Sequence, residues 1–365
     1  MAFFSTRRRS IFGLDVGNGG IKLVELQQNR KNNTITLQRF LIQPTPADSI
    51  ENGLVTDPAR LRGALRQLLK DFGARSLAVN TVLTGQSLIV RHVEVPRMSR
   101  EEFKKVLQLQ ADTHFGLPTD HLSIDFQIVR ELPDNRMLVF LVGSPKQPIL
   151  DFVDLLKESG FTAKRVDIEP MAALRSLRMT AALTPDCLDA TCVVLDLGAG
   201  TSNLSIFRED LLQLVRVITV AGNDLTREIA NGQGISLQQA EELKRQYGVL
   251  PDTPIYEQIR PTFQRLLRQV AMTLEYYQIE NRDKPVNYLR VIGGNSKLTG
   301  LVDALAASVA ELYQRLNMPV PDVALGQPRL SLHQRVNQAD AEENGPILAV
   351  AIGLALGEVA ADATD

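Results

Sequence analysis

The chain of 365 residues contains no tryptophan, and only 5% of its residues are aromatic. So few aromatic side chains argue against a stacking surface for single-stranded nucleic acid. The formal net charge of −2 also gives no electrostatic reason for nonspecific binding to nucleic acid. The composition therefore predicts a protein with no nucleic-acid partner.

Cysteine and histidine are also scarce, with two and four copies. Cys187 and Cys192 lack CxxC spacing and the histidines do not cluster, so no metal site is predicted from them. We interpret both cysteines as small apolar residues in a reducing compartment. No apolar run approaches the ~18 residues of a membrane-spanning helix. The arginines at 7–9 precede no apolar signal segment; they are interpreted as a solvated tail, with weak contact to anionic lipid as the alternative.

What the chain does contain is a duplicated motif. LDVGNGGIKL at 14–23 and LDLGAGTSNL at 195–204 share Leu, Asp, Gly, Gly and Leu at equal offsets, between apolar runs. The pattern predicts a strand, a tight turn and a second strand. We expect the turn glycines to adopt positive φ and direct backbone N–H groups at an anion, and Asp15 and Asp196 to hold a divalent cation through water. One copy could be an ordinary strand turn, but two favour a clamp on the phosphates of a nucleotide.

Three further features could line the same site, and each has an ordinary structural alternative. Gly293, Gly294 and Asn295 follow an apolar strand, where glycine would let a flat ring lie against the backbone; the alternative is a plain strand–helix turn. Glu241 and Lys244 offer a carboxylate and an ammonium on one helix face, which could equally be a solvated surface. Glu169 begins a helix after a strand and could orient a water molecule or serve the helix dipole.

The order of predicted elements divides the chain into two halves. Residues 1–190 form the first half, which includes an inserted strand–helix–strand–strand–helix module at 86–160. Residues 191–345 form the second half, in which a helix is predicted from Pro261 and no clear element at 316–335. Residues 346–365 contain an apolar helix that begins at Pro346 and packs back on the first half. Strands and helices in this order predict an α/β protein.

The two DxG hairpins and the late Gly-Gly turn resemble the nucleotide-binding pattern of actin and the sugar kinases. The inserted module resembles the FtsA-like branch of that superfamily, and nine stretches are similar to the PilM family of type IV pilus assembly. They run in family order, among them VEVPRMSREEF (93–103) and FGLPTDHLSIDFQIV (115–129). The other stretches are 11–26, 166–175, 193–207, 221–230, 238–248, 288–301 and 349–357. Segment 93–129 is the specific part, because the phosphate loops occur in other actin-like proteins.

The resemblance implies an actin-like ATPase fold, with duplicated ribonuclease-H-like domains and an FtsA-type α+β subdomain inserted in the first half. It implies ATP with Mg²⁺ as the ligand, and weak hydrolysis at most. The implied contacts are Asp15, Gly17, Asn18 and Gly19 in the first loop, Asp196, Gly198, Ala199, Gly200 and Thr201 in the second, and Glu241, Lys244, Gly293, Gly294 and Asn295 around adenosine. Where the family usually carries Ser or Thr, the first loop reads Asn18-Gly19-Gly20, so a hydroxyl for phosphate is missing.

The resemblance also implies partners. A PilM-like protein lies in the cytoplasm and docks the N-terminal cytoplasmic tail of PilN, an inner-membrane protein, in a groove between the main and inserted subdomains. That groove would fall near 86–118. Contact with PilO and the pilus motor would be indirect, the membrane would be reached only through the partner, and self-association is also allowed. The implied processes are pilus biogenesis, twitching motility and DNA uptake.

Two alternatives remain open at the level of sequence. A small-molecule kinase of the same fold would need a catalytic aspartate, for which Asp167 is a candidate, and a polar substrate pocket. An FtsA-like filament protein of cell division would be expected to carry a C-terminal amphipathic anchor, whereas the last six residues here are short and acidic.

Overall fold

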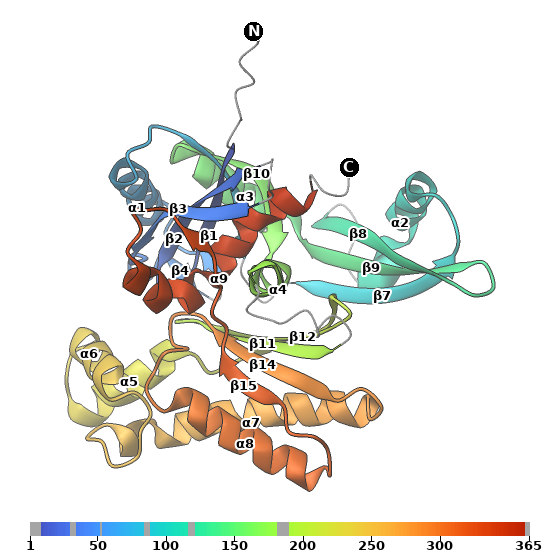
Figure 1. Cartoon of the computed structure of the whole chain (residues 1–365). Coiled ribbons are helices and arrows are strands. Elements are labelled where there is room, and N and C mark those ends of the chain that lie inside the picture. Colours follow the sequence, from blue (N-terminus) through green and yellow to red (C-terminus); the bar gives the residue numbers. More distant parts are fainter. Residues whose placement is uncertain are drawn as a thin grey trace. The chain divides into compact units, whose positions relative to one another are not determined.

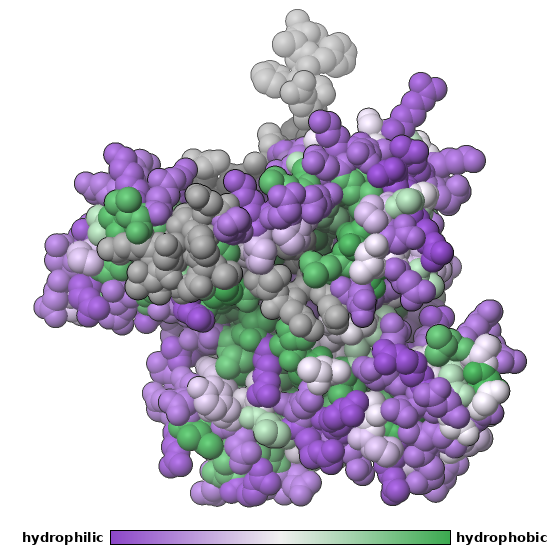
Figure 2. Space-filling view, turned by 180° about the vertical axis from the view of Figure 1, so that it is seen from behind, coloured by the Kyte–Doolittle hydropathy of each residue, from purple (hydrophilic) through white to green (hydrophobic). Residues whose placement is uncertain are grey.

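The computed structural model describes residues 9–29, 34–51, 53–83, 88–115, 121–180 and 190–361, and shows helices packed around β-sheets (Figure 1). Cys187 and residues 1–8 lie outside the described residues. The chain separates into two compact units, Met1–Thr84 with Lys157–Asp365, and Gly85–Leu156. In the rear view of Figure 2, hydrophilic residues cover most of the visible surface, with hydrophobic residues in smaller groups.

The first sheet of the larger unit has six strands in the order β10-β6-β1-β2-β3-β16. The strands are β1 (Arg9–Val16), β2 (Ile21–Asn29), β3 (Thr34–Gln43), β6 (Leu77–Leu83), β10 (Phe161–Ile168) and β16 (Ser331–Leu332). The first three form an antiparallel meander, and β6 and β10 run parallel to β1. Helix α1 (Pro58–Asp71) precedes β6, and the short strands β4 (Ile50–Glu51) and β5 (Leu54–Val55) pair with each other. Asp57 caps α1 as predicted, because its carboxylate accepts the free amides of Ala59 and Arg60.

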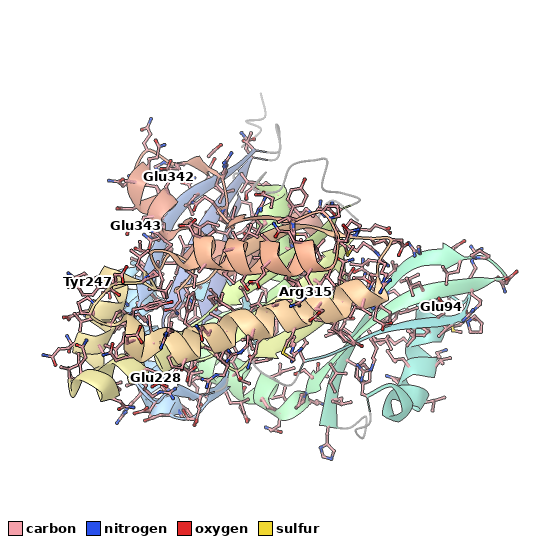
Figure 3. The ribbon with its side chains drawn as sticks, turned by 90° about the horizontal axis from the view of Figure 1, so that it is seen from below. Glu94, Glu228, Tyr247, Arg315, Glu342 and Glu343 are labelled. Atoms are coloured by element: carbon pink, nitrogen blue, oxygen red, sulfur yellow. The ribbon has the colours of Figure 1, made fainter. Side chains whose placement is uncertain are left out.

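The second sheet repeats this plan with five strands in the order β13-β12-β11-β14-β15. The strands are β11 (Thr191–Leu197), β12 (Ser202–Arg208), β13 (Leu211–Ile218), β14 (Val286–Ile292) and β15 (Asp322–Leu325). Its helices are α5 (Gly222–Gln233), α6 (Leu237–Tyr247), α7 (Tyr256–Glu280) and α8 (Leu301–Arg315). Helices α7 and α8 lie side by side in Figures 1 and 3, and Arg315 pairs with Glu275 at 3.1 Å. Apolar side chains of this sheet and its helices form one buried core.

Two further helices complete the larger unit, α4 (Glu169–Met179) and α9 (Gln338–Ala361). Helix α9 contacts α4, β1, β2 and β6. Close approach requires glycine, since a Cβ at Gly353 would collide with the carbonyl oxygen of Ala172. Within the described ranges, none of the helices has the length and apolar content needed to cross a bilayer.

The smaller unit is described on its own. Its sheet has the order β7-β9-β8, formed by β7 (Ile89–Pro96), β8 (Leu122–Leu132) and β9 (Arg136–Pro145). Helices α2 (Arg100–Phe115) and α3 (Lys146–Glu158) accompany it, and α3 runs past the end of the unit. The predicted capping box of α2 is confirmed, because the Ser99 hydroxyl accepts the Glu102 amide at 3.2 Å and Glu102 accepts the Ser99 amide at 2.8 Å. Phe103, Phe126 and Val139 contribute to its core.

Three predictions of element bounds were wrong. Helix α9 begins before Pro346, because Asn337 caps it by accepting the amide of Ala339 at 2.8 Å. Helix α7 likewise begins at Tyr256, five residues before Pro261, so the proline lies inside the helix and leaves one backbone hydrogen bond unmade. The segment at 316–335 contains β15 and β16, which are too short to show a period in the sequence.

Candidate functional site

The two duplicated motifs fold into two equivalent hairpins. In the first, Asp15 on β1 pairs in register with Lys22 on β2; in the second, Asp196 on β11 pairs with Asn203 on β12. Each turn closes with the same backbone bond, from the N–H of Gly17 to the Gly20 oxygen and from the N–H of Gly198 to the Thr201 oxygen, both 3.1 Å. The predicted strand–turn–strand structure is therefore confirmed for both copies.

The expected positive φ of the turn glycines was wrong. None of the glycines in either turn has a positive φ. They are needed for space instead: a Cβ on Gly198 would lie 2.5 Å from the Thr201 oxygen, and one on Gly19 would lie 2.7 Å from the Ala199 Cβ. A Cβ on Gly200 would collide with Asn18. The two turns therefore lie directly against each other.

Charged groups gather where the two hairpins meet. The Lys22 ammonium donates to Asp15 Oδ2 at 2.9 Å, and the Asn203 amide donates to Glu169 Oε1 at 2.8 Å. Glu169 is the first residue of α4, directly after β10, so it reaches the cluster from the first half while Asn203 comes from the second. Asp196 electrostatically influences both Lys22 and Glu169. The structure thus brings together three carboxylates, one ammonium and one amide.

Burial and repulsion between negative charges raise the pKa of two of these carboxylates, Glu169 and Asp196. Burial, with the negative charges of Asp196 and Asp15, raises the pKa of Glu169 to about 8. Burial also raises the pKa of Asp196 to about 6, against the opposing effect of Lys22. For Lys22, burial alone would lower the pKa, but Asp15, Asp196 and Glu169 raise it above its ordinary value. The cluster therefore favours an additional positive charge.

The donors fit a hard divalent cation, because carboxylate oxygens are the ligands that Mg²⁺ prefers. Within the part of the chain that the structure describes, no three Asp, Glu, His or Cys side chains are placed to hold one ion directly. Asp15 and Asp196 therefore suit an ion that keeps much of its own water, as Mg²⁺ does.

The Gly-Gly turn after β14 lies against the second hairpin. Gly293 has φ +93°, and a Cβ there would collide with Asp196. The Asn295 amide donates to the Gly198 oxygen at 2.8 Å, so Asn295 fixes the turn. A Cβ on Gly294 would meet no atom within 4 Å, which leaves an open surface beside the turn.

Glu241 and Lys244 differ in what they can offer a ligand. Lys244 is 2% exposed, and its ammonium donates to Gly222 O (3.1 Å), Thr226 Oγ1 (2.9 Å) and Glu241 Oε2 (2.6 Å). These three bonds use all the donors of an ammonium and tie α6 to the start of α5. The Glu241 side chain is 31% exposed. Burial would raise its pKa, but Lys244, Thr226 and Arg245 lower it, so Glu241 is the ionised and accessible member of the pair.

A family model for the type IV pilus assembly protein PilM matches residues 13–359. The chain belongs to the PilM family. A solved structure of a PilM-PilN type IV pilus biogenesis complex contains a similar chain, with a TM-score of 0.80 and 29% identity over 97% of this chain and 99% of that one.

Two relatives outside the PilM family are less similar to this chain. The cell division protein FtsA of Rhizobium meliloti is 27% identical over 222 residues, which span 54% of this chain but only 47% of FtsA. MreB 5 of Spiroplasma citri, solved bound to AMPPNP, has a TM-score of 0.51 at 13% identity over 98% of each chain. The latter likeness concerns the fold alone and, with the PilM match, confirms the predicted α/β actin-like ATPase fold.

Sequence reasoning missed Lys22 and Asn203 in this PilM-family chain. The signal was present, because each is a polar residue inside an apolar strand, at the same offset from its Asp.

The kinase alternative loses support, since Asp167 forms an ion pair with Arg175 at 3.0 Å and accepts the Ile168 amide at 2.8 Å. Both oxygens of the Asp167 carboxylate therefore already have partners within the protein.

Proposed function

We propose that this chain is an ATP-binding component of the type IV pilus inner-membrane assembly platform that docks the N-terminal cytoplasmic tail of PilN. The observation that carries the proposal is the likeness to the chain of the PilM-PilN complex over 97% of this sequence. A protein of this kind would link PilN, and through it PilO, to the pilus motor. It would lie in the cytoplasm at the inner membrane.

In the proposal, the two facing hairpins bind the phosphates of ATP with Mg²⁺. The turn residues that would surround the phosphates are Gly17, Asn18, Gly19, Gly198, Ala199, Gly200 and Thr201. Asp15 and Asp196 would hold Mg²⁺ through water, and Lys22 would exchange its bond with Asp15 for one with a phosphate oxygen. The contact between the two turns supports this role, because a ligand touching one turn would be next to the other.

On the adenosine side, the proposal uses the open backbone at Gly293 and Gly294 and the exposed carboxylate of Glu241. Asn295 and Lys244 would act mainly by positioning these groups, because both are engaged by protein atoms. A carboxylate is a suitable acceptor for ribose hydroxyls.

Hydrolysis would be weak. Mg²⁺, when bound, would neutralise phosphate charge. Glu169 would accept a proton from water, held in place by the Asn203 amide at 2.8 Å. Because its pKa is raised to about 8, Glu169 is mostly protonated at neutral pH until a cation enters the cluster. We propose that nucleotide acts chiefly by favouring one conformation and so altering the affinity for PilN.

Calorimetric titration with a synthetic PilN N-terminal peptide, with and without Mg-ATP, tests both parts. We expect the peptide to bind, and its affinity to change with nucleotide. Asp196→Asn should abolish the nucleotide effect while leaving peptide binding intact. Asp303→Asn, on the exposed face of α8, is the matched control and should retain the effect.

The outcomes separate the two claims. No peptide binding in either condition would exclude the PilN assignment. Peptide binding without any ATP binding would exclude the nucleotide site. ATP binding that Asp196→Asn leaves unchanged would place the nucleotide elsewhere on the chain.

A further inference from the structure

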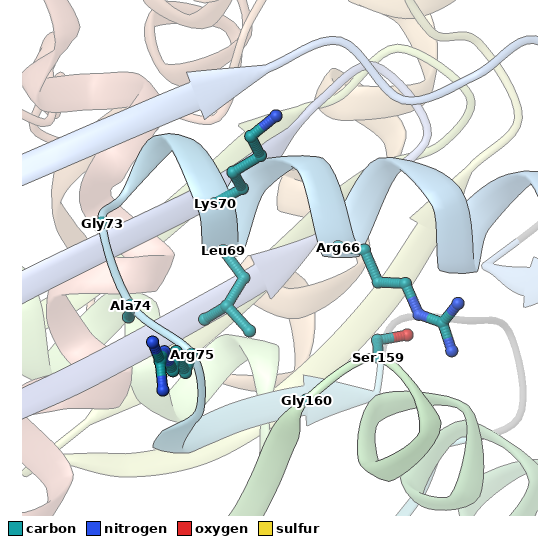
Figure 4. Close-up of a pocket in the computed structure, with 8 residues that line it drawn as sticks. All are labelled: Arg66, Leu69, Lys70, Gly73, Ala74, Arg75, Ser159 and Gly160. Atoms are coloured by element: carbon teal, nitrogen blue, oxygen red, sulfur yellow. The ribbon is translucent and has the colours of Figure 1, made fainter.

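A basic hollow lies at the C-terminal end of α1, away from the hairpins. Its volume is about 450 Å³, and it is lined by Arg66, Leu69, Lys70, Gly73, Ala74, Arg75, Ser159 and Gly160 (Figure 4). Three of these side chains are cationic and none is acidic. All eight belong to the larger unit of the chain.

The cations are not required to cap the helix. The last carbonyls of α1 already accept backbone amides, at 2.9 Å for Leu68 and Lys70 and 3.1 Å for Leu69. Arg66 donates to the backbone oxygen of Glu158 at 2.9 Å. Over the described ranges, Lys70 and Arg75 form no ion pair. The helix end therefore gives no reason for three cations at this place.

Two nearby acidic groups, Glu158 and Asp71, offset only part of the positive charge around the hollow. The Glu158 carboxylate pairs with Arg62 at 2.6 Å, so it offsets a different cation. Asp71 accepts a hydrogen bond from Gln67 at 2.8 Å and is exposed to solvent. Arg66, with Lys70 and Arg75, thus gives this surface an excess of positive charge.

The hollow is separate from the candidate nucleotide site. Arg75 lies just before β6 and Gly160 just before β10, at the N-terminal ends of strands parallel to β1. Asp15 and Glu169 lie at the opposite ends of β1 and β10. Strand β6 has 7 residues, so the two sites are about 20 Å apart at ~3.3 Å per residue.

We propose that this basic hollow binds the phosphate groups of anionic phospholipids. Figure 4 shows Arg66 and Lys70 leaving the helix in different directions, with Arg75 on the far side of Leu69. Side chains spread in this way suit several headgroups on a flat surface better than one free phosphate held by convergent donors. Leu69 is only 5% exposed, so the hollow lacks the apolar anchor expected for an acidic peptide.

This inference goes beyond the proposed function, in which the membrane is reached only through PilN. A direct contact would be electrostatic, and added salt would weaken it because the charges are exposed. It would orient the chain with the hollow toward the bilayer.

Cosedimentation of the full-length protein with vesicles of phosphatidylglycerol and phosphatidylcholine at low salt tests the proposal. We expect binding to these vesicles and none to phosphatidylcholine alone. Lys70→Gln/Arg75→Gln should lower partitioning about 30-fold, at about 1 kcal/mol per cation. The control Arg265→Gln/Arg268→Gln removes the same charge from the exposed face of α7 and should change partitioning less than about twofold.

Each of the following results would overturn the proposal. Equal losses in both double variants would indicate only bulk charge. Failure of the wild-type protein to sediment with anionic vesicles would exclude the lipid contact. Two-dimensional NMR titrations with inorganic phosphate and with polyglutamate cover the other sources. Shifts at Lys70 and Arg75 with either probe, without vesicle binding, would assign the hollow to a free anion or an acidic segment.

Discussion

Binding of Mg²⁺ to the carboxylate cluster should release protons, since the cation and the protons compete for the same groups. The pKa of Glu169 is raised to about 8 and that of Asp196 to about 6. At pH 7, Glu169 is therefore about 90% protonated before the ion arrives. A divalent cation at Asp15 and Asp196 favours the ionised form of every carboxylate near it.

The size of the effect follows from these two values. If the bound state requires both groups ionised, the affinity for Mg²⁺ rises about 100-fold between pH 6 and pH 8. About one proton is released per ion at pH 7, mostly from Glu169. Because the groups interact, the two values describe the titration of the cluster as a whole.

Calorimetric titration with Mg²⁺ in two buffers of different ionisation enthalpy measures the proton count directly. Nucleotide is left out, since ATP itself binds Mg²⁺ and releases protons. Glu169→Gln keeps an acceptor for the Asn203 amide but cannot titrate, so proton release should fall to about a tenth. Glu280→Gln, at the exposed end of α7, is the matched control and should behave as the wild type.

Two results would refute this reasoning. Mg²⁺ binding with no proton release between pH 6 and pH 8 would mean that the ion does not enter the cluster. Unchanged release in Glu169→Gln would mean that the protons come from other groups.

Three further predictions concern stability and the clamp. Because the pKa of Glu169 is raised from 4.5 to about 8, its proton stabilises the folded, metal-free protein fully below pH 4.5, and this stabilisation is lost as the pH rises through about 8. The free energy of unfolding measured with urea should therefore fall by up to about 2 kcal/mol from pH 6 to pH 8. Gly353→Ala should cost about 2 kcal/mol or more by overpacking α9, whereas Gly63→Ala, open to solvent on α1, should stabilise by about 0.5 kcal/mol. Gly19→Ala should weaken Mg-ATP binding in a calorimetric titration, because the added Cβ would lie 2.7 Å from the Ala199 Cβ and push the two turns apart.

Each of these three predictions has an outcome that would contradict it. Stability that rises with pH, or a slope unchanged by Glu169→Gln, would exclude a proton held at this residue. Equal changes in the free energy of unfolding for the two glycine substitutions would show that α9 has space for a Cβ at Gly353. Unchanged Mg-ATP affinity in Gly19→Ala would mean that ATP does not lie between the turns.

Much of the fold could be predicted from local sequence patterns. Asp57 before Pro58 marks a helix start, because the carboxylate accepts free amides and proline has none to lose. The motifs at Asp15 and Asp196 predicted both hairpins, since apolar runs around a glycine turn leave few alternatives. The capping box at Ser236 likewise fixed the start of α6.

What the sequence did not predict depends on contacts between distant segments. Helix α9 begins before Pro346 because Asn337, nine positions before the apolar stretch, caps it. The polar turns between them show no apolar period from which a helix could be predicted. The turn glycines were expected to be needed for positive φ, but at Gly19 the constraint is the lack of space beside Ala199 in the other turn, 180 positions away. Only the folded chain brings such pairs together.

The two duplicated hairpins carry different side chains seven residues after the aspartate, and this difference sets the charge of the cluster. Lys22 places a positive charge next to Asp15, while Asn203 offers a neutral amide beside Asp196 and donates it to Glu169. With a second lysine in place of Asn203, the cluster would be close to neutral and would attract a divalent cation less strongly. With an amide in place of Lys22, three carboxylates would face one another without a counter-charge, at a cost in stability. One lysine and one amide leave the cluster short of one positive charge, which is what the proposed binding of Mg²⁺ with a nucleotide requires.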